Sequence, residues 1–135
     1  MALKLIGNAE LGLGNLLDSQ KCQLQSFELY KAIGDKEGQW RTMNNLANVA
    51  MDEKNKSETH RLLIAGLRIA EDIDDHEGMG VFKFRMATLF GESPEEQNTL
   101  LTEAIEHSTK AEDYEVASSA IFARVDLLTV MTKGK

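Results

Sequence analysis

Residues 33–38 read IGDKEG and residues 73–78 read IDDHEG, so one pattern returns after forty residues. The repeat is either a duplicated binding loop or the boundary between repeated structural units. A shift of forty residues also aligns Leu24 with Ile64, and a third copy with a loop shortened by two residues starts in the same register at residue 86. Self-similarity at such a period is typical of stacked helical repeats, so the pattern predicts a boundary.

Apolar residues recur at steps of three and four, the spacing that places side chains on one face of a helix. In the second copy one stripe is Met43, Leu46, Ala47 and Ala50, and the other is Leu63, Gly66, Leu67, Ala70 and Ile73. We expect these stripes, with Ile33 and Ile73 at their ends, to face a core. The chain is rich in helix formers and has one Pro, so the prediction is an all-α protein. The predicted helices span residues 2–12, 19–33, 36–51, 56–73, 76–90, 94–110 and 113–132.

Helix-boundary residues stand between these segments. Asp35, Asp75 and Asp113 are in position to cap the helices that follow them, and Ser93-Pro94 is typical of a helix start. Gly34 suits the left-handed conformation that often ends a helix. Glu37 and Glu77 would then lie in first turns, where negative charge is favourable.

Charge and composition exclude several classes of function. The net charge of -7 disfavours non-specific nucleic-acid binding, because an acidic surface repels phosphates. A single cysteine rules out an intramolecular disulfide and a multi-cysteine zinc site. No apolar run is long enough to cross a membrane, and we expect a cytoplasmic protein.

No motif predicts catalysis, a metal or a cofactor. The acidic segment 71–78 lacks the ligand spacing of a calcium loop, and its counterpart in the first copy lacks the acids. His60, His76 and His107 occupy dissimilar repeat positions without metal-ligand spacing, so we interpret them as surface histidines. Cys22 has no neighbouring base. We therefore expect a protein that is not an enzyme and that needs no cofactor.

The phrases Met43-x-x-Leu46-Ala47-x-x-Ala50 and Met86-Ala87-x-x-Phe90 resemble the first helix of tetratricopeptide repeats (TPR), in the long-period variety. Gly7 would fill the same small position as Ala47 and Ala87. The closing Pro of that family is missing, and Thr59 and Gln97 replace its early Ala in the second helix. The resemblance implies a right-handed α-solenoid in a single domain, residues 1–135. It would hold about three helix-turn-helix repeats (1–34, 35–74 and 75–112) and a capping helix, 113–132.

In such solenoids the first helices line a concave surface that binds ligands. The corresponding positions are Lys4, Asn8, Arg41, Asn44, Asn45, Asn48, Phe84, Arg85, Thr88, Ser119 and Phe122. None of these is acidic; Asn matches a peptide backbone and Arg a carboxylate. We therefore expect a non-catalytic interaction module or scaffold that binds a peptide or protein segment with acidic or C-terminal carboxylate character.

Two alternatives stay open at this point. The same residues could form a solvated polar helix face, and the chain could be a regulatory sensor domain that binds a small signalling peptide or ligand. We also expect that two copies could associate through the terminal helices, which carry Leu3, Ile6, Leu127, Val130 and Met131.

Overall fold

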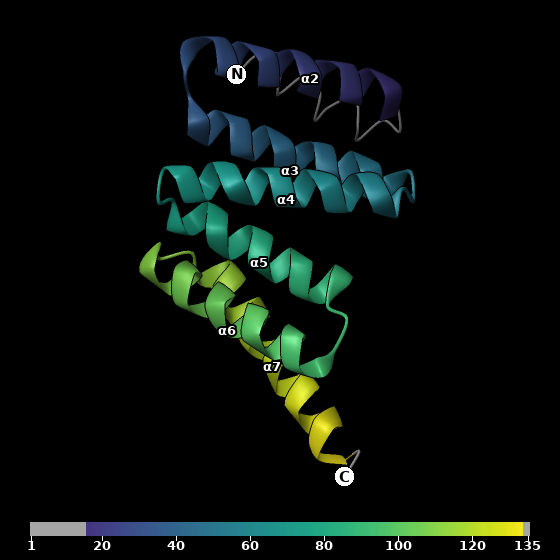
Figure 1. Ribbon diagram of the computed structural model, residues 1–135, viewed down its shortest axis with the longest axis vertical. Coiled ribbons are helices and arrows are strands. Elements are labelled where there is room, and N and C mark those ends of the chain that lie inside the picture. The colour runs from purple at the N-terminus through teal and green to yellow at the C-terminus, as the bar shows by residue number, and fades with distance from the viewer. Residues whose placement is uncertain (1–15, 134–135) are drawn as a thin grey trace. The chain divides into compact units, whose positions relative to one another are not determined.

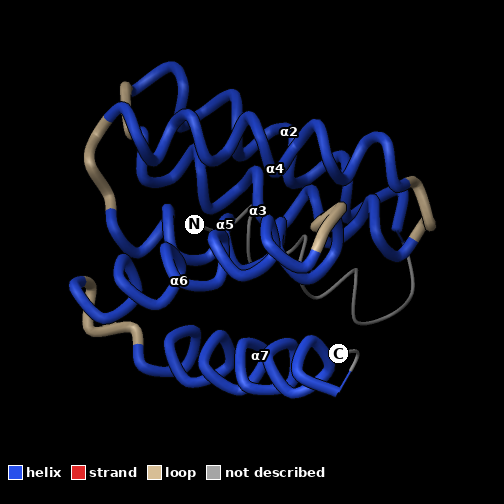
Figure 2. The backbone as a smooth tube through the Cα atoms, turned by 60° about the horizontal axis from the view of Figure 1, so that its bottom comes forward, coloured by secondary structure: helices blue, strands red, loops and turns tan. Residues whose placement is uncertain are grey.

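The computed structural model describes residues 16–133, and within this range the chain forms only helices and short loops (Figures 1 and 2). The helices fall into two compact units, which divide between Ile73 and Asp74. The predicted helix 2–12 and Gly7 lie outside the described residues.

The first unit contains α2 (Leu16–Ile33), α3 (Lys36–Asp52) and α4 (Lys56–Asp72). Helix α3 packs against both α2 and α4, and Figure 1 shows it between them. The core of the first unit contains Trp40, which is 2% exposed, and Leu63, which is fully buried. Trp40 therefore belongs to the packing of this unit.

The second unit contains α5 (His76–Phe90), α6 (Pro94–Lys110) and α7 (Tyr114–Lys133). Helix α6 packs against both neighbours, and α7 also contacts α5. Three of the four residues in its main core cluster are alanines, and the cluster consists of Ala87, Leu101, Ala104 and Ala120. Small side chains allow the helix axes to approach closely. A Cβ at Gly80 would lie 2.6 Å from the hydroxyl oxygen of Ser108 on α6.

The sequence-predicted helix boundaries within the described range are confirmed to within three residues at every end. Asp35 and Asp75 cap α3 and α5, because each carboxylate accepts the N–H of the residue three positions later. Ser93 caps α6 in the same way, with Pro94 as the first helical residue.

Three turns share one hydrogen-bonded geometry. The N–H groups of Asp35, Asn55 and Asp113 donate to carbonyl oxygens five residues earlier, at 2.9, 2.9 and 2.8 Å. The residue before each is left-handed: Gly34, Lys54 and Glu112 have φ of 75°, 60° and 59°. This arrangement satisfies carbonyls at the end of one helix, while the side chain of the next residue caps the following helix. The segment IGDKEG is such a turn, as predicted.

The predicted packing of Ile33 and Ile73 is wrong. Their side chains are 74% and 41% exposed. Ile33 is the last residue of α2 and lies beyond Tyr30, whose ring packs on Gly38 of α3. The face of α2 that is buried is polar instead, and consists of Ser19, Gln23 and Ser26.

Candidate functional site

Arg41, Asn44, Asn45 and Asn48 follow one another on α3 at steps of three, one and three residues, which places them on one face of the helix. All four are half-buried. The remaining circumference of α3 holds the buried residues Gly38, Gln39, Trp40, Thr42, Leu46, Ala47, Val49 and Ala50. We call these four polar residues the α3 face. Because the helix behind it is fixed by packing, the α3 face is a rigid surface.

Contacts with Glu37 and Trp40 help to hold the Arg41 guanidinium on this face. It donates to the Glu37 carboxylate at 3.1 Å, one helical turn earlier. It also lies 4.5 Å from the centre of the Trp40 ring. The ion pair is exposed and is worth at most about 1 kcal/mol, whereas the cation–π contact rests on the buried Trp40 ring and does not involve Glu37. Arg41 is therefore oriented but can exchange Glu37 for another carboxylate at small cost.

Two of the asparagines differ in what their amides do. Asn45 donates to the Gln23 side-chain oxygen at 3.4 Å and so joins α3 to α2. Asn48 makes no side-chain hydrogen bond within residues 16–133. Its amide, which offers a donor and an acceptor, is therefore the group on the α3 face best placed to bind another molecule.

The sequence-predicted list contains no acid, but the structure shows acids at both ends of the α3 face. Glu37 lies one turn before Arg41, and Asp52 lies one turn after Asn48. Both belong to the same side of α3 by helical spacing. The local charge is thus mixed rather than basic.

The predicted residues of the second unit have varied surroundings. The Phe84 ring packs against the core of this unit, and the Thr88 hydroxyl bonds to the carbonyls of Phe84 and Arg85. Burial lowers the pKa of the Arg85 guanidinium. Ser119 and Phe122 are exposed on α7. Lys4 and Asn8 lie outside the described residues.

The structure brings together two of the three histidines that were interpreted as surface residues, and both are half-buried against each other. The Nδ1 atoms of His76 and His107 are 2.8 Å apart, and the two rings stack with their centroids 5.1 Å apart. His76 begins α5 and His107 lies in the last turn of α6, so the pair joins the two helices at the end opposite their connecting loop. A hydrogen bond between two Nδ1 atoms needs one of them unprotonated. The signal that could have found the pair is their nearly equal distance from the turn at residues 91–93.

This pair predicts a pH-dependent stability. Burial, with Lys83 and His76 nearby, lowers the pKa of His107, an effect that Glu103 partly opposes. The unfolded chain then binds a proton more readily than the folded one, so the free energy of unfolding falls as pH falls below about 6.5. Urea unfolding between about pH 7 and 5 should show this loss in the wild type and a smaller loss in His107→Gln. The matched control is His60→Gln, at an exposed residue; an identical pH slope in all three proteins would refute the prediction.

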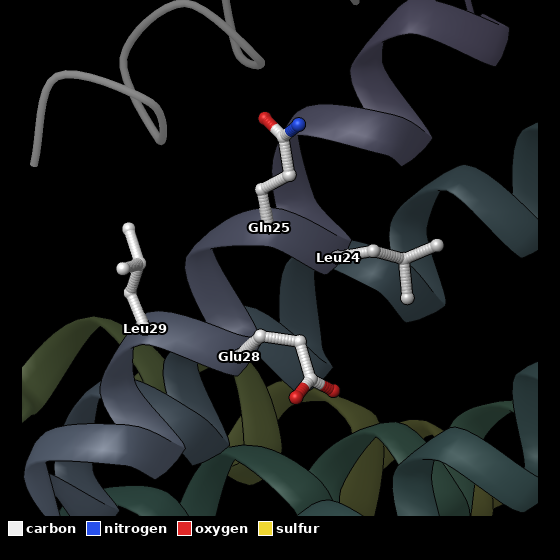
Figure 3. Close-up of a pocket in the computed structure, with 4 residues that line it drawn as sticks. All are labelled: Leu24, Gln25, Glu28 and Leu29. Atoms are coloured by element: carbon white, nitrogen blue, oxygen red, sulfur yellow. The ribbon is translucent and has the colours of Figure 1, made fainter.

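Helix α2 carries a shallow hollow on its surface. Leu24, Gln25, Glu28 and Leu29 line it, and Figure 3 shows their side chains spreading apart along a single helix. No polar groups converge there. Within residues 16–133, no three His, Cys, Asp or Glu side chains gather closely enough to hold a metal ion.

Comparison with models of protein families gives no match, and comparison with curated proteins finds no similar sequence. Within the part of the chain that the structure describes, no helix is both long and apolar enough to cross a membrane.

Proposed function

We propose that this chain is a non-catalytic interaction module whose α3 face binds an extended peptide or protein segment. We further propose that its helices form a right-handed, TPR-like solenoid of about three hairpins with α7 as the capping helix. Support for the second part comes from antiparallel neighbours joined by one recurring turn geometry. The observation that carries the first part is the half-buried Asn48 amide, which has no hydrogen-bond partner in the described chain.

The chemistry of the α3 face suits a peptide backbone. An extended chain presents N–H and C=O groups in alternation, and one Asn amide can pair with both kinds. Asn48 lies on α3, whose other sides are buried. The backbone of α3 therefore loses little conformational freedom when a peptide binds. Arg41 could hold a carboxylate of the bound segment after exchanging its partner Glu37.

A peptide selection tests this proposal. Short random peptides displayed with a free C-terminus are enriched on the immobilised wild-type chain, and the binders are measured in solution. Asn48→Ala should weaken the selected peptides about tenfold, because it removes a donor and an acceptor from the bound interface. The matched control is Gln25→Ala, which removes an exposed amide from α2 and should leave affinity unchanged.

A second arm separates backbone recognition from carboxylate recognition. Amidation of the peptide C-terminus and the substitution Arg41→Ala should weaken binding together, whereas Arg68→Ala, at an exposed arginine on α4, should not. Circular dichroism and thermal unfolding confirm that each variant is folded. If the wild type enriches no peptide, or if Asn48→Ala binds every enriched peptide as tightly as the wild type does, the proposed role of the α3 face is refuted.

A further inference from the structure

Helix α7 exposes a second apolar face that its own unit does not use. Tyr114, Ile121, Val125 and Leu128 are 63%, 47%, 54% and 38% exposed. Their steps of seven, four and three residues place them in one line along the helix. A different side of α7 carries Ala120 and Leu127, which pack into the core of the unit. We call the four exposed residues the α7 stripe.

A shallow depression runs beside the C-terminal half of the α7 stripe. Its lining residues are Val125, Leu128, Thr129, Thr132 and Lys133. The aliphatic part of Lys133 and the two threonine methyl groups extend the apolar surface. The depression therefore offers a place for a bulky side chain of a partner, next to a positive charge.

Charges at the two ends of α7 lie on the same side of the helix. Glu115 is in the first turn and Lys133 is in the last. They are separated by eighteen residues, which is about five full turns. Both residues therefore lie on the same side of the α7 stripe. The negative charge of Glu115 is at one end of it and the positive charge of Lys133 is at the other.

We propose that two copies of this chain pair through the α7 stripe in an antiparallel arrangement. Residues on the same side of two antiparallel helices meet, so Glu115 of each copy lies beside Lys133 of the other. The same register places Ile121 against Leu128 of the second copy and the two Val125 side chains near the two-fold axis. Tyr114 then reaches the depression beside Lys133. In a parallel pair the two-fold axis would run along the helices, so Glu115 and Lys133 of one copy would lie across the interface from those of the other and could not form these ion pairs.

This arrangement corrects the residues expected from sequence for self-association. Leu127 packs into the core of its own unit, and Val130 is exposed but lies off the α7 stripe by helical spacing. Leu3 and Ile6 lie outside the described residues. The proposed pairing does not depend on peptide binding at α3.

The oligomeric state of the whole chain tests the proposal. Sedimentation equilibrium of the wild type should show a monomer–dimer equilibrium. Val125→Glu places two carboxylates at the apolar centre and should raise the dimer dissociation constant about a hundredfold or more. The control is Val130→Glu, the same substitution on the same helix at a residue that is 67% exposed, and it should leave the dissociation constant nearly unchanged.

Charge reversal tests the direction of pairing. Glu115→Lys should weaken the dimer about tenfold by setting lysines together at both ends, and Glu115→Lys with Lys133→Glu should restore it. In a parallel dimer neither change would have this pattern. Any one of three results would overturn the proposal. The wild type stays monomeric up to about millimolar concentration; Val130→Glu weakens the dimer as much as Val125→Glu does; or the double reversal fails to restore the dimer. Circular dichroism establishes that the variants remain helical.

Discussion

Leu63→Ala should lower the free energy of unfolding by about 2–5 kcal/mol. The Leu63 side chain on α4 is 0% exposed, so truncation removes buried methyl groups and leaves a cavity that neighbouring helices fill only in part. A loss of this size is a large share of the ~5–15 kcal/mol that stabilises a typical domain. Urea denaturation followed by circular dichroism measures it.

The control for this prediction is Leu29→Ala, the same substitution in the same unit. Leu29 on α2 is 57% exposed, and its truncation should change the free energy of unfolding by about 0.5 kcal/mol or less. Equal losses for the two variants would mean that the assignment of buried and exposed faces in this unit is wrong.

Gly38→Ala should lower the free energy of unfolding by about 1–3 kcal/mol. Alanine normally stabilises a helix interior relative to glycine by about 0.5–1 kcal/mol, so a loss here reverses the usual sign. The reason is steric, because a Cβ at this position would lie 2.3 Å from a carbon of the Tyr30 ring on α2. The ring would have to move and give up its contact with α3.

A double-mutant cycle isolates this contact. In a Tyr30→Ala background the obstacle is absent, and Gly38→Ala should become neutral or stabilising. Thermal unfolding of the four proteins supplies the required values. The same cost in both backgrounds would show that Gly38 serves some purpose other than close packing against Tyr30.

Capping residues explain why the helix boundaries could be predicted from sequence. Asp35, Asp75 and Ser93 are capping residues whose local hydrogen bonds do not depend on tertiary structure. Left-handed residues were predicted only at Gly34. Lys54 and Glu112 adopt the same conformation, imposed by the turn although their side chains do not favour it. Sequence composition cannot reveal such positions.

Contacts across the helical hairpins were predictable in principle but were missed. Gln23 and Asn45 lie eleven residues on either side of Gly34, and Tyr30 and Gly38 lie four residues on either side. Residues equally far from a tight turn between antiparallel helices face each other. This rule would have paired Asn45 with Gln23 and shown that Asn45 is partly engaged within the fold.

The face of α2 that is buried could not be predicted from polarity. Ser19, Gln23 and Ser26 are buried, while Leu17, Leu24 and Leu29 on the same helix are exposed. Hydrophobic periodicity assumes that apolar residues mark the inner face, and α2 does not obey it. Which face of α2 is buried depends on the helices that pack around it, and this is set by the tertiary structure.

The most direct test of the α3 face is an NMR titration of the isotope-labelled chain with a peptide selected on it. We expect the largest chemical-shift changes in the backbone and side-chain amide signals of α3, centred on Asn48, and their loss in Asn48→Ala. Signals of Gln25 on α2 should stay in place. Changes centred on any other helix, or unchanged binding by Asn48→Ala, would contradict the proposed site.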